Sequence, residues 1–300
     1  MKKTILITGS NGLLGQKLVD LLSKEDNIQL IATAKGENRL PNQNGFTYQS
    51  MDITDPKEVH AVFAKFQPHI VIHTAAMTNV DTCESDLEGC ELLNVTAVSY
   101  LVSACAEYGS FLCHLSTDFI FDGAAGPYDE EAIPNPISVY GESKLKAEQI
   151  IQASNIRWAI ARTVLVFGIV PDMSRTNIIL WVKKSLEDGK QINVVTDQFR
   201  TPTLAEDLAI GCWLIAQKEA EGIFNISGEE LLTPYEMAIQ TAAFFHLPKE
   251  LIKPADSSTF SQPAKRPPRT GFILTKAKQE LGYQPRTFSE GIALLATQIH

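Results

Sequence analysis

Cysteine is scarce in this sequence, and the cysteines present form no ligand or redox pattern. The five are Cys83, Cys90, Cys105, Cys113 and Cys212, with no C-x-x-C pair among them and no histidine at the spacing of a metal site. Metal-binding and redox-active cysteines are usually marked by such spacings. We therefore expect reduced core thiols in a cytoplasmic protein, and no metal site.

The sequence also lacks an excess of basic residues and any long apolar run. Its 26 Lys and Arg against 35 Asp and Glu give a formal net charge of -9. Nucleic acid is not an expected partner, because phosphate binding needs a basic surface. No stretch reaches the ~20 apolar residues of a membrane span. The apolar start of the chain is interrupted at Gly9, Asn11 and Gly12, so we predict a first strand there and not a signal peptide.

A glycine-rich turn is the first motif that the sequence does contain. A β-rich run, residues 4–8, leads into G-x-x-G-x-x-G and then into a helical pattern. In such a strand, turn and helix, the glycines permit a tight turn, let the backbone approach a pyrophosphate and let the helix pack closely on the strand. The alternative is a purely structural turn. We predict a dinucleotide site with contacts from Gly9, Asn11, Gly12, Leu13, Leu14 and Gly15.

The residue after the second predicted strand, residues 28–33, bears on the choice of cofactor. A carboxylate there accepts a hydrogen bond from the adenosine ribose of NAD, whereas basic side chains favour the 2'-phosphate of NADP. Here Lys35 and Arg39 follow the strand and no carboxylate stands in place. We predict NADPH, with NADH as the second choice. The alternative is that both are ordinary surface charges.

The next two predicted strands, residues 46–51 and 69–73, end in residues that suit a cofactor. Asp52 is predicted to accept a hydrogen bond from the adenine amine and Ile53 to pack on the ring, while Asp52 as the N-cap of a helix at 56–66 is a compatible alternative. Ala75 and Ala76 are small enough for a cofactor to lie against the backbone. His73, inside an apolar run, is predicted to be a core histidine without a catalytic role.

Two short strings carry the predicted chemistry, STD at residues 116–118 and YGESK at residues 140–144. Residues four apart share one face of a helix, so Tyr140 and Lys144 can converge on one reacting group. A neighbouring cation lowers the pKa of a phenol, which would make Tyr140 a usable acid. Thr117, at the end of a predicted buried strand, would place its hydroxyl on the same substrate oxygen. Asn94, inside the helix predicted at 87–108, is predicted to be structural, and a water relay to Lys144 is the alternative.

Alternating strands and helices predict an α/β fold with a doubly wound parallel sheet. Together with the glycine turn and Tyr-x-x-x-Lys, this order resembles the extended short-chain dehydrogenase/reductases over the first half of the chain. The strings STDFIFDG, YGESKLKAE, DQFRTPT and AKRP resemble the dTDP-4-dehydrorhamnose reductases. That resemblance implies that Tyr140 protonates a C4 carbonyl oxygen, that Thr117 hydrogen-bonds the same oxygen, and that Lys144 holds the nicotinamide ribose and lowers the tyrosine pKa.

The second half is expected to bind the nucleotide-sugar substrate. We predict a dinucleotide-binding part at residues 1–165 plus about 200–222, and a smaller discontinuous α/β substrate part at about 166–199 plus 223–300. Guanidinium groups match phosphate oxygens, so Arg200 and Arg266 are candidates for a substrate diphosphate, beside Asp118, Thr117 and Tyr140. A homodimer is a further expectation.

Several segments depart from the reductase pattern. Leu165 replaces a usual tryptophan, Arg200 a usual glycine, and Arg269 lies in an altered segment after the Arg-Pro pair. These departures affect the identity of the sugar nucleotide more than the reductase chemistry. We predict NADPH-dependent reduction of dTDP-4-dehydro-L-rhamnose to dTDP-L-rhamnose. The alternatives are another nucleotide-sugar reductase or epimerase, or a non-catalytic NADP-binding subunit, because residues 222–267 also resemble the regulatory beta subunit of methionine adenosyltransferase.

Overall fold

A seven-stranded parallel sheet forms the centre of the computed structural model, which describes residues 2–172 and 176–299. Its strand order is β10-β6-β5-β4-β1-β2-β3. The chain winds outward from β1 to β3, returns to β4 beside β1, and then winds the other way, so the sheet is doubly wound as predicted. The strands are β1 (Lys3–Thr8), β2 (Ile28–Ala34), β3 (Thr47–Ser50), β4 (Ile70–His73), β5 (Phe111–Thr117), β6 (Trp158–Thr163) and β10 (Gly222–Asn225).

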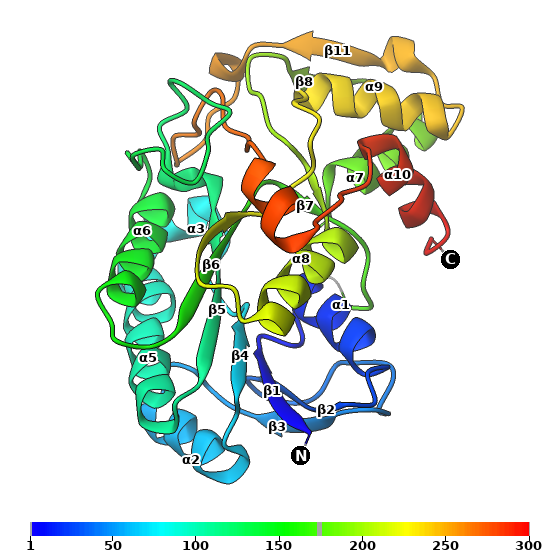
Figure 1. The fold of residues 1–300 in the computed structure, drawn as a ribbon. Helices are drawn as coiled ribbons and strands as arrows, with labels where there is room; N and C mark the ends of the chain where they lie inside the picture. Colours follow the sequence, from blue (N-terminus) through cyan, green and yellow to red (C-terminus); the bar gives the residue numbers. More distant parts are fainter. Residues whose placement is uncertain (1, 173–175, 300) are drawn as a thin grey trace.

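Helices cover both faces of this sheet (Figure 1). On one face α1 (Leu13–Leu22) and α8 (Ala205–Lys218) contribute to a core cluster with the central strands. On the other face lie α2 (Pro56–Phe66), α5 (Ala97–Tyr108) and α6 (Val139–Gln152). The continuous hydrophobic strands follow from this arrangement, because a parallel sheet is buried on both sides.

The helix predicted at residues 87–108 is interrupted by a wider turn. It consists of α4 (Leu87–Glu91), a π-helical turn at Leu92–Thr96 and α5, and the short helix α3 (Val80–Ser85) precedes it. Within the described part of the chain, only Leu87–Tyr108 is long and apolar enough to cross a membrane. The buried helices of globular cores meet the same criteria, and the buried face of α5 packs in the second core cluster with α2.

The smaller part of the molecule packs over one end of the sheet. It contains α7 (Ile178–Glu187), α9 (Pro234–Phe244) and α10 (Phe288–Ala296), with the strand pairs β8 (Ile192–Val195) with β11 (Ile252–Ala255), and β7 (Val166–Phe167) with β9 (Thr203–Leu204). Residues 223–225, which the predicted division assigns to the substrate part, lie in β10 and pair with β6 in the large sheet. Residues 173–175 of the predicted substrate part lie outside the described residues.

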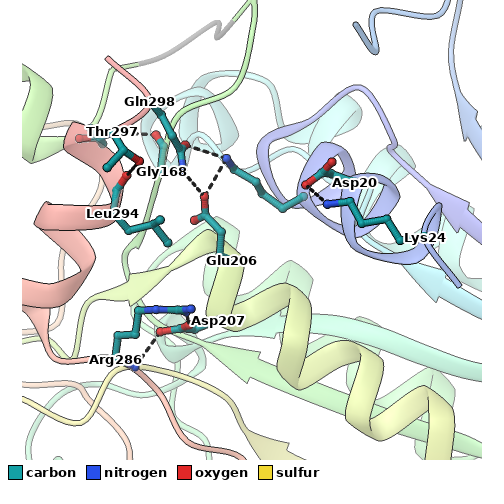
Figure 2. Close-up of polar contacts among 11 residues, drawn as sticks. Asp20, Lys24, Gly168, Glu206, Asp207, Arg286, Leu294, Thr297 and Gln298 are labelled. Carbon is teal, nitrogen blue, oxygen red and sulfur yellow. Dashed lines mark hydrogen bonds and ion pairs between the residues drawn. The ribbon is translucent and has the colours of Figure 1, made fainter. Parts of the chain in front are cut away.

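Hydrogen bonds and ion pairs connect the C-terminal segment to α1 and α8 (Figure 2). The Nζ of Lys17 on α1 lies 2.8 Å from Glu206 and donates to Gln298 at 2.9 Å. Gln298 in turn donates to Glu206 at 2.7 Å, and Arg286 forms an ion pair with the buried Asp207. The first turn of α8 is therefore bound from two directions.

A buried ion pair joins α6 to β6. The guanidinium of Arg162 donates to both carboxylate oxygens of Glu148, at 3.0 and 2.7 Å, and to the carbonyl of Glu130. Both side chains are almost fully buried. Such a fork is held in place by the geometry of its two parallel hydrogen bonds.

Removing one partner of this pair should destabilise the fold. Glu148→Ala leaves a buried guanidinium without its counter-ion, and we expect the free energy of unfolding to fall by about 3–5 kcal/mol. The control is an exposed ion pair of the same helix, between Lys146 of α6 and Glu91. Glu91→Ala should change the free energy of unfolding by less than about 1 kcal/mol. Urea denaturation measures both, and equal losses in the two variants would contradict the expectation.

Candidate functional site

The glycine turn has the geometry that a dinucleotide needs. Gly9 has a φ of +68°, and a Cβ on Gly9 or Gly15 would collide with backbone atoms of the neighbouring turn. Helix α1 begins after Gly12 with no side-chain cap, so its first N–H groups are available to an anion. The buried hydroxyl of Ser10 has no partner. Leu13 and Leu14 form the first turn of α1. These features fit a bound pyrophosphate.

Asn11 fixes the loop that carries the predicted cofactor-selecting residues. Its amide donates to the carbonyl of Glu37 at 2.8 Å, and its Oδ1 accepts from the backbone N–H of Arg39 at 2.9 Å. Both contacts bind the loop after β2 to the glycine turn. Arg39 is thereby held beside the turn, as a residue that selects a 2'-phosphate would have to be.

Lys35 and Asp52 contact each other at the ends of β2 and β3. Their side chains are 2.6 Å apart. Burial acts to raise the pKa of Asp52, but hydrogen bonds from Lys35 and Thr54 outweigh it and lower that pKa. The N-cap of α2 is Asp55, so the suggestion that Asp52 caps this helix is wrong. Ile53 is buried in the core cluster beneath α2 and α5.

The turn after β4 lies against the glycine turn. The hydroxyl of Thr8 accepts the backbone N–H groups of Thr74 and Ala75, at 3.2 and 3.4 Å. Ala75 and Ala76 are partly exposed there. Asn94 lies in the π-helical turn, where its amide exchanges two hydrogen bonds with the backbone of Met77 and donates to Ser143. Asn94 therefore has the structural contacts predicted for it.

Thr117, Tyr140 and Lys144 come together at the carboxyl end of β5. Thr117 is the last residue of the strand, and Ser138 caps α6 by accepting from Gly141. A Cβ on Gly141 would collide with the carbonyl oxygen of Phe119, so glycine permits the close approach of the helix to the strand end. All three predicted catalytic side chains are buried.

The pKa shifts at this site differ from the sequence-based expectation. Burial raises the pKa of Tyr140, with Thr117 acting in the opposite direction as a hydrogen-bond partner. The lowering of the tyrosine pKa that was expected from Lys144 is not found. Burial instead lowers the pKa of Lys144 itself, to about 8. The site therefore holds a protonated phenol at neutral pH.

Two histidines lie behind Lys144, and the sequence reasoning missed one of them, His114. The Nε2 of His114 is 3.1 Å from the Lys144 Nζ, and the ring of His114 lies 5.1 Å from that of His73, centroid to centroid. His73 is a core histidine as predicted, but only its Nδ1 has a partner, the Thr8 hydroxyl at 2.7 Å. Their positions opposite each other on β4 and β5 depend on strand register, which no local pattern in the sequence reveals.

The predicted substrate residues are occupied by contacts within the protein. Asp118 is buried, accepts from Thr270, and lies 3.7 Å from the Nε of Arg200. The other nitrogens of Arg200 donate to the carbonyls of Phe199 and Pro267. Burial raises the pKa of Asp118 and lowers that of Arg200. Arg200 thus lies inside the protein, although a surface contact with a diphosphate was expected.

Arg266 is likewise bound to a carboxylate of the sheet domain. Its guanidinium donates to both oxygens of Asp81 on α3, at 3.3 and 2.8 Å. Hydrogen bonding from Arg266 lowers the pKa of Asp81. Arg266 therefore connects the smaller part of the molecule to α3, and Arg200, from the predicted dinucleotide-binding part, contacts the residue that follows the end of β5.

Residues 2–172 and 176–299 were searched for side chains that could bind a metal ion. No group of three or more His, Cys, Asp or Glu side chains in these residues is placed to hold a metal ion. A cavity of about 170 Å³ lies behind α1, lined by residues such as Gln16, Leu40 and Phe46 and by none of the predicted catalytic residues.

The family model that matches this chain and the similar proteins agree with each other. Residues 1–300 match a family model described as RmlD substrate binding domain. Methionine adenosyltransferase 2 subunit beta of Mus musculus is 32% identical over 296 residues, covering 97% of this chain and 86% of the relative. dTDP-4-dehydrorhamnose reductase of Aggregatibacter actinomycetemcomitans is 29% identical over 302 residues, covering 96% of each.

A solved structure with the same fold spans the whole molecule. dTDP-4-dehydrorhamnose reductase from Bacillus anthracis, in complex with NADP, superposes with a TM-score of 0.88 at 25% identity, covering 100% of both chains. The predicted fold class and the predicted resemblance are confirmed. The chain belongs to the RmlD substrate binding domain family.

Proposed function

We propose that this protein is an NADPH-dependent reductase of a 4-keto nucleotide sugar. The observation that carries the proposal is the buried group formed by Thr117, Tyr140 and Lys144 at the carboxyl end of β5. It lies at the end of the sheet where doubly wound folds bind their ligands. The reductase relatives in the family support the same reaction.

The proposed roles follow from the state of each side chain. Burial keeps the phenol of Tyr140 protonated, so Tyr140 is the proton donor to the ketone oxygen. Thr117 donates to the same oxygen and stabilises the charge that develops on it. Lys144, as a cation, holds the nicotinamide ribose hydroxyls and stabilises the phenolate left after proton transfer. NADPH, when bound, supplies the hydride.

The residues at the adenosine end favour NADPH, with NADH as the second choice. Gly9, Asn11, Gly12 and Gly15 would hold the pyrophosphate. Lys35 is exposed and forms its ion pair with Asp52, so a 2'-phosphate can compete for its ammonium. The structure from Bacillus anthracis contains NADP. Ala76, which is partly exposed, would line the remaining surface, whereas Ile53 is buried in the core cluster.

The substrate is proposed to be dTDP-4-dehydro-L-rhamnose, bound between the two parts of the molecule. The division at residues 1–165 plus 200–222 and 166–199 plus 223–300 is kept as a proposal, with residues 222–225 moved to the sheet. Because Arg200 and Arg266 already bind Asp118 and Asp81, a diphosphate would have to displace these carboxylates. That the protein binds neither nucleic acid nor membrane, forms a homodimer and lies in the cytoplasm stays a prediction. A dehydratase is less favoured, since Phe119 follows Asp118 where dehydratases commonly carry a glutamate.

A second candidate is a non-catalytic NADP-binding subunit. Two observations favour it. The chain is 32% identical to methionine adenosyltransferase 2 subunit beta of Mus musculus. In addition, Arg200 replaces a glycine of the reductase pattern, and its side chain occupies the space between Asp118 and Pro267. A regulatory subunit would keep the cofactor site and lose the sugar site.

Tyr140→Phe should abolish ketone reduction while NADPH still binds. The change removes only the donated proton, and we expect turnover to fall by roughly 10²–10⁴-fold. Oxidation of NADPH with dTDP-4-dehydro-L-rhamnose measures turnover, and NADPH fluorescence measures binding. Tyr108→Phe is the matched control, because Tyr108 ends α5 near the start of β5, at the opposite end of the strand from Thr117.

The same assay separates the two candidates. Tight NADPH binding without turnover in the wild-type protein, together with a stable complex with the catalytic subunit of methionine adenosyltransferase on gel filtration, would overturn the reductase in favour of the regulator. Turnover lost equally in Tyr140→Phe and Tyr108→Phe would instead show that Tyr140 is not the donor.

Lys144→Met should stabilise the protein at pH 7 and weaken NADPH binding. Burial lowers the pKa of Lys144 from its ordinary value of 10.5 to about 8 in the folded protein, so the buried cation opposes folding below pH 8. We expect a gain of roughly 1–3 kcal/mol in the free energy of unfolding at pH 7. Wild-type stability then rises with pH between 8 and 10.5, so this gain shrinks. Urea denaturation at pH 7 and 9.5 checks it, and a gain that is absent at pH 7 or grows with pH would contradict it.

A further inference from the structure

The hydroxyl group of Thr117 already has hydrogen-bond partners inside the protein. It donates to the Oδ1 of Asp118 at 3.2 Å and accepts the backbone N–H of Phe119, also at 3.2 Å. Thr117 is in addition a hydrogen-bond partner of Tyr140. A hydroxyl group has a single hydrogen to donate. Asp118 therefore competes with the ketone oxygen of the proposed substrate for the hydrogen of Thr117.

The other oxygen of the Asp118 carboxylate is bound by residues from elsewhere in the chain. Its Oδ2 accepts from the hydroxyl of Thr270 and lies 3.7 Å from the Nε of Arg200. All three side chains are buried. A buried carboxylate without a hydrogen-bond donor or a nearby cation takes up a proton. Thr270 and Arg200 therefore stabilise the ionised form of Asp118.

Backbone contacts hold these two partners of Asp118 in place. The guanidinium of Arg200 donates to the carbonyls of Phe199 and Pro267, at 2.7 and 2.6 Å. The backbone N–H of Thr270 donates to the same carbonyl of Phe199, at 3.1 Å. The segments 199–200 and 267–270 are thus bound to each other, and both present a donor or a cation to Asp118.

We propose that Asp118, held by Thr270 and Arg200, is a positioning residue that controls the hydroxyl hydrogen of Thr117. In the resting protein this hydrogen points to the Oδ1 of Asp118. During ketone reduction it turns to the ketone oxygen without leaving Thr117, and the Asp118 carboxylate then depends on Thr270 and Arg200. These two are positioning residues as well, because they act through Asp118. The role in turnover rests on the proposed reductase function.

Asp118 also acts on the proposed proton donor. Burial raises the pKa of Tyr140 on α6, and the negative charge of Asp118 acts in the same direction. Burial lowers the pKa of Arg200, with the charge of Asp118 opposing this change and that of Arg266 adding to it. The ionised Asp118 therefore influences both groups that are proposed to donate to the ketone oxygen, Thr117 and Tyr140.

Carbon NMR of the Asp118 carboxyl group tests these hydrogen bonds and needs no turnover. The ¹³C signal is assigned by its loss in Asp118→Asn. We expect its titration midpoint to rise by roughly one pH unit in Thr117→Val and in Thr270→Val, because each variant loses a donor to the charged form. Thr270→Ser keeps a hydroxyl and should keep the wild-type midpoint. The same midpoint in Thr117→Val as in wild type would overturn the proposal.

Steady-state kinetics with NADPH and dTDP-4-dehydro-L-rhamnose test the effect on turnover. Thr270→Val leaves the Asp118 carboxylate more dependent on the hydrogen of Thr117, so we expect kcat to fall roughly 10-fold with KM nearly unchanged. Thr270→Ser should restore kcat, because it restores the donor.

The matched control for the kinetics is Thr241→Val. Thr241 is a fully buried threonine on α9 whose hydroxyl donates to the carbonyl of Met237, so the variant removes a buried hydrogen bond away from Asp118. Its kcat should equal that of wild type. Equal losses in Thr270→Val and Thr241→Val, or no recovery in Thr270→Ser, would contradict the positioning role.

The two measurements also separate this proposal from the proposed function. Turnover that is lost in Tyr140→Phe but unchanged in Thr270→Val would overturn the positioning role and leave the reductase standing. Shifted Asp118 midpoints in a protein that reduces no ketone would overturn the reductase, while the resting hydrogen bond between Thr117 and Asp118 would stand.

Discussion

The close packing of α6 against the end of β5 is the constraint on which the predicted site depends. Gly141 lies over the carbonyl of Phe119, where no side chain fits. This contact brings the phenol and the ammonium of one helix face to the hydroxyl at the strand end, and it removes all of them from water. The unusual pKa values of Tyr140 and Lys144 are direct consequences of that burial.

A second constraint acts between the two parts of the molecule. The buried Asp118 is bound by Arg200 and by Thr270, and Thr270 comes from the smaller part. Arg266 and Asp81 form a second contact of this kind nearer the surface. Because Asp118 directly follows Thr117, the contact with Thr270 joins the smaller part to the predicted catalytic strand end.

The sequence predicts what local patterns determine. The glycine turn, the alternation of strands and helices, and the helix at Pro56–Phe66 follow from local spacing, and each is found where expected, although the helix is capped by Asp55 and not by Asp52. What depends on distant partners was missed. Lys35 and Asp52 meet only because β2 and β3 are neighbours, Arg200 is buried only because residues 267–270 pack beside it, and His114 reaches Lys144 across a helix–sheet interface. Burial raises the pKa of Tyr140, opposite to the expected direction, and burial depends on the whole fold.

Residues from the last part of the sequence complete the hydrophobic core beside the sheet. Phe272, Leu274 and the fully buried Tyr283 pack in the same cluster as Ile5 and Leu18, and β10 closes the sheet edge only after α8. Strands β1–β6 thus leave the ribosome long before the residues that cover them. During synthesis the nascent sheet exposes an apolar face and an unpaired edge, so productive folding waits for the last part of the chain or for a chaperone that shields that face.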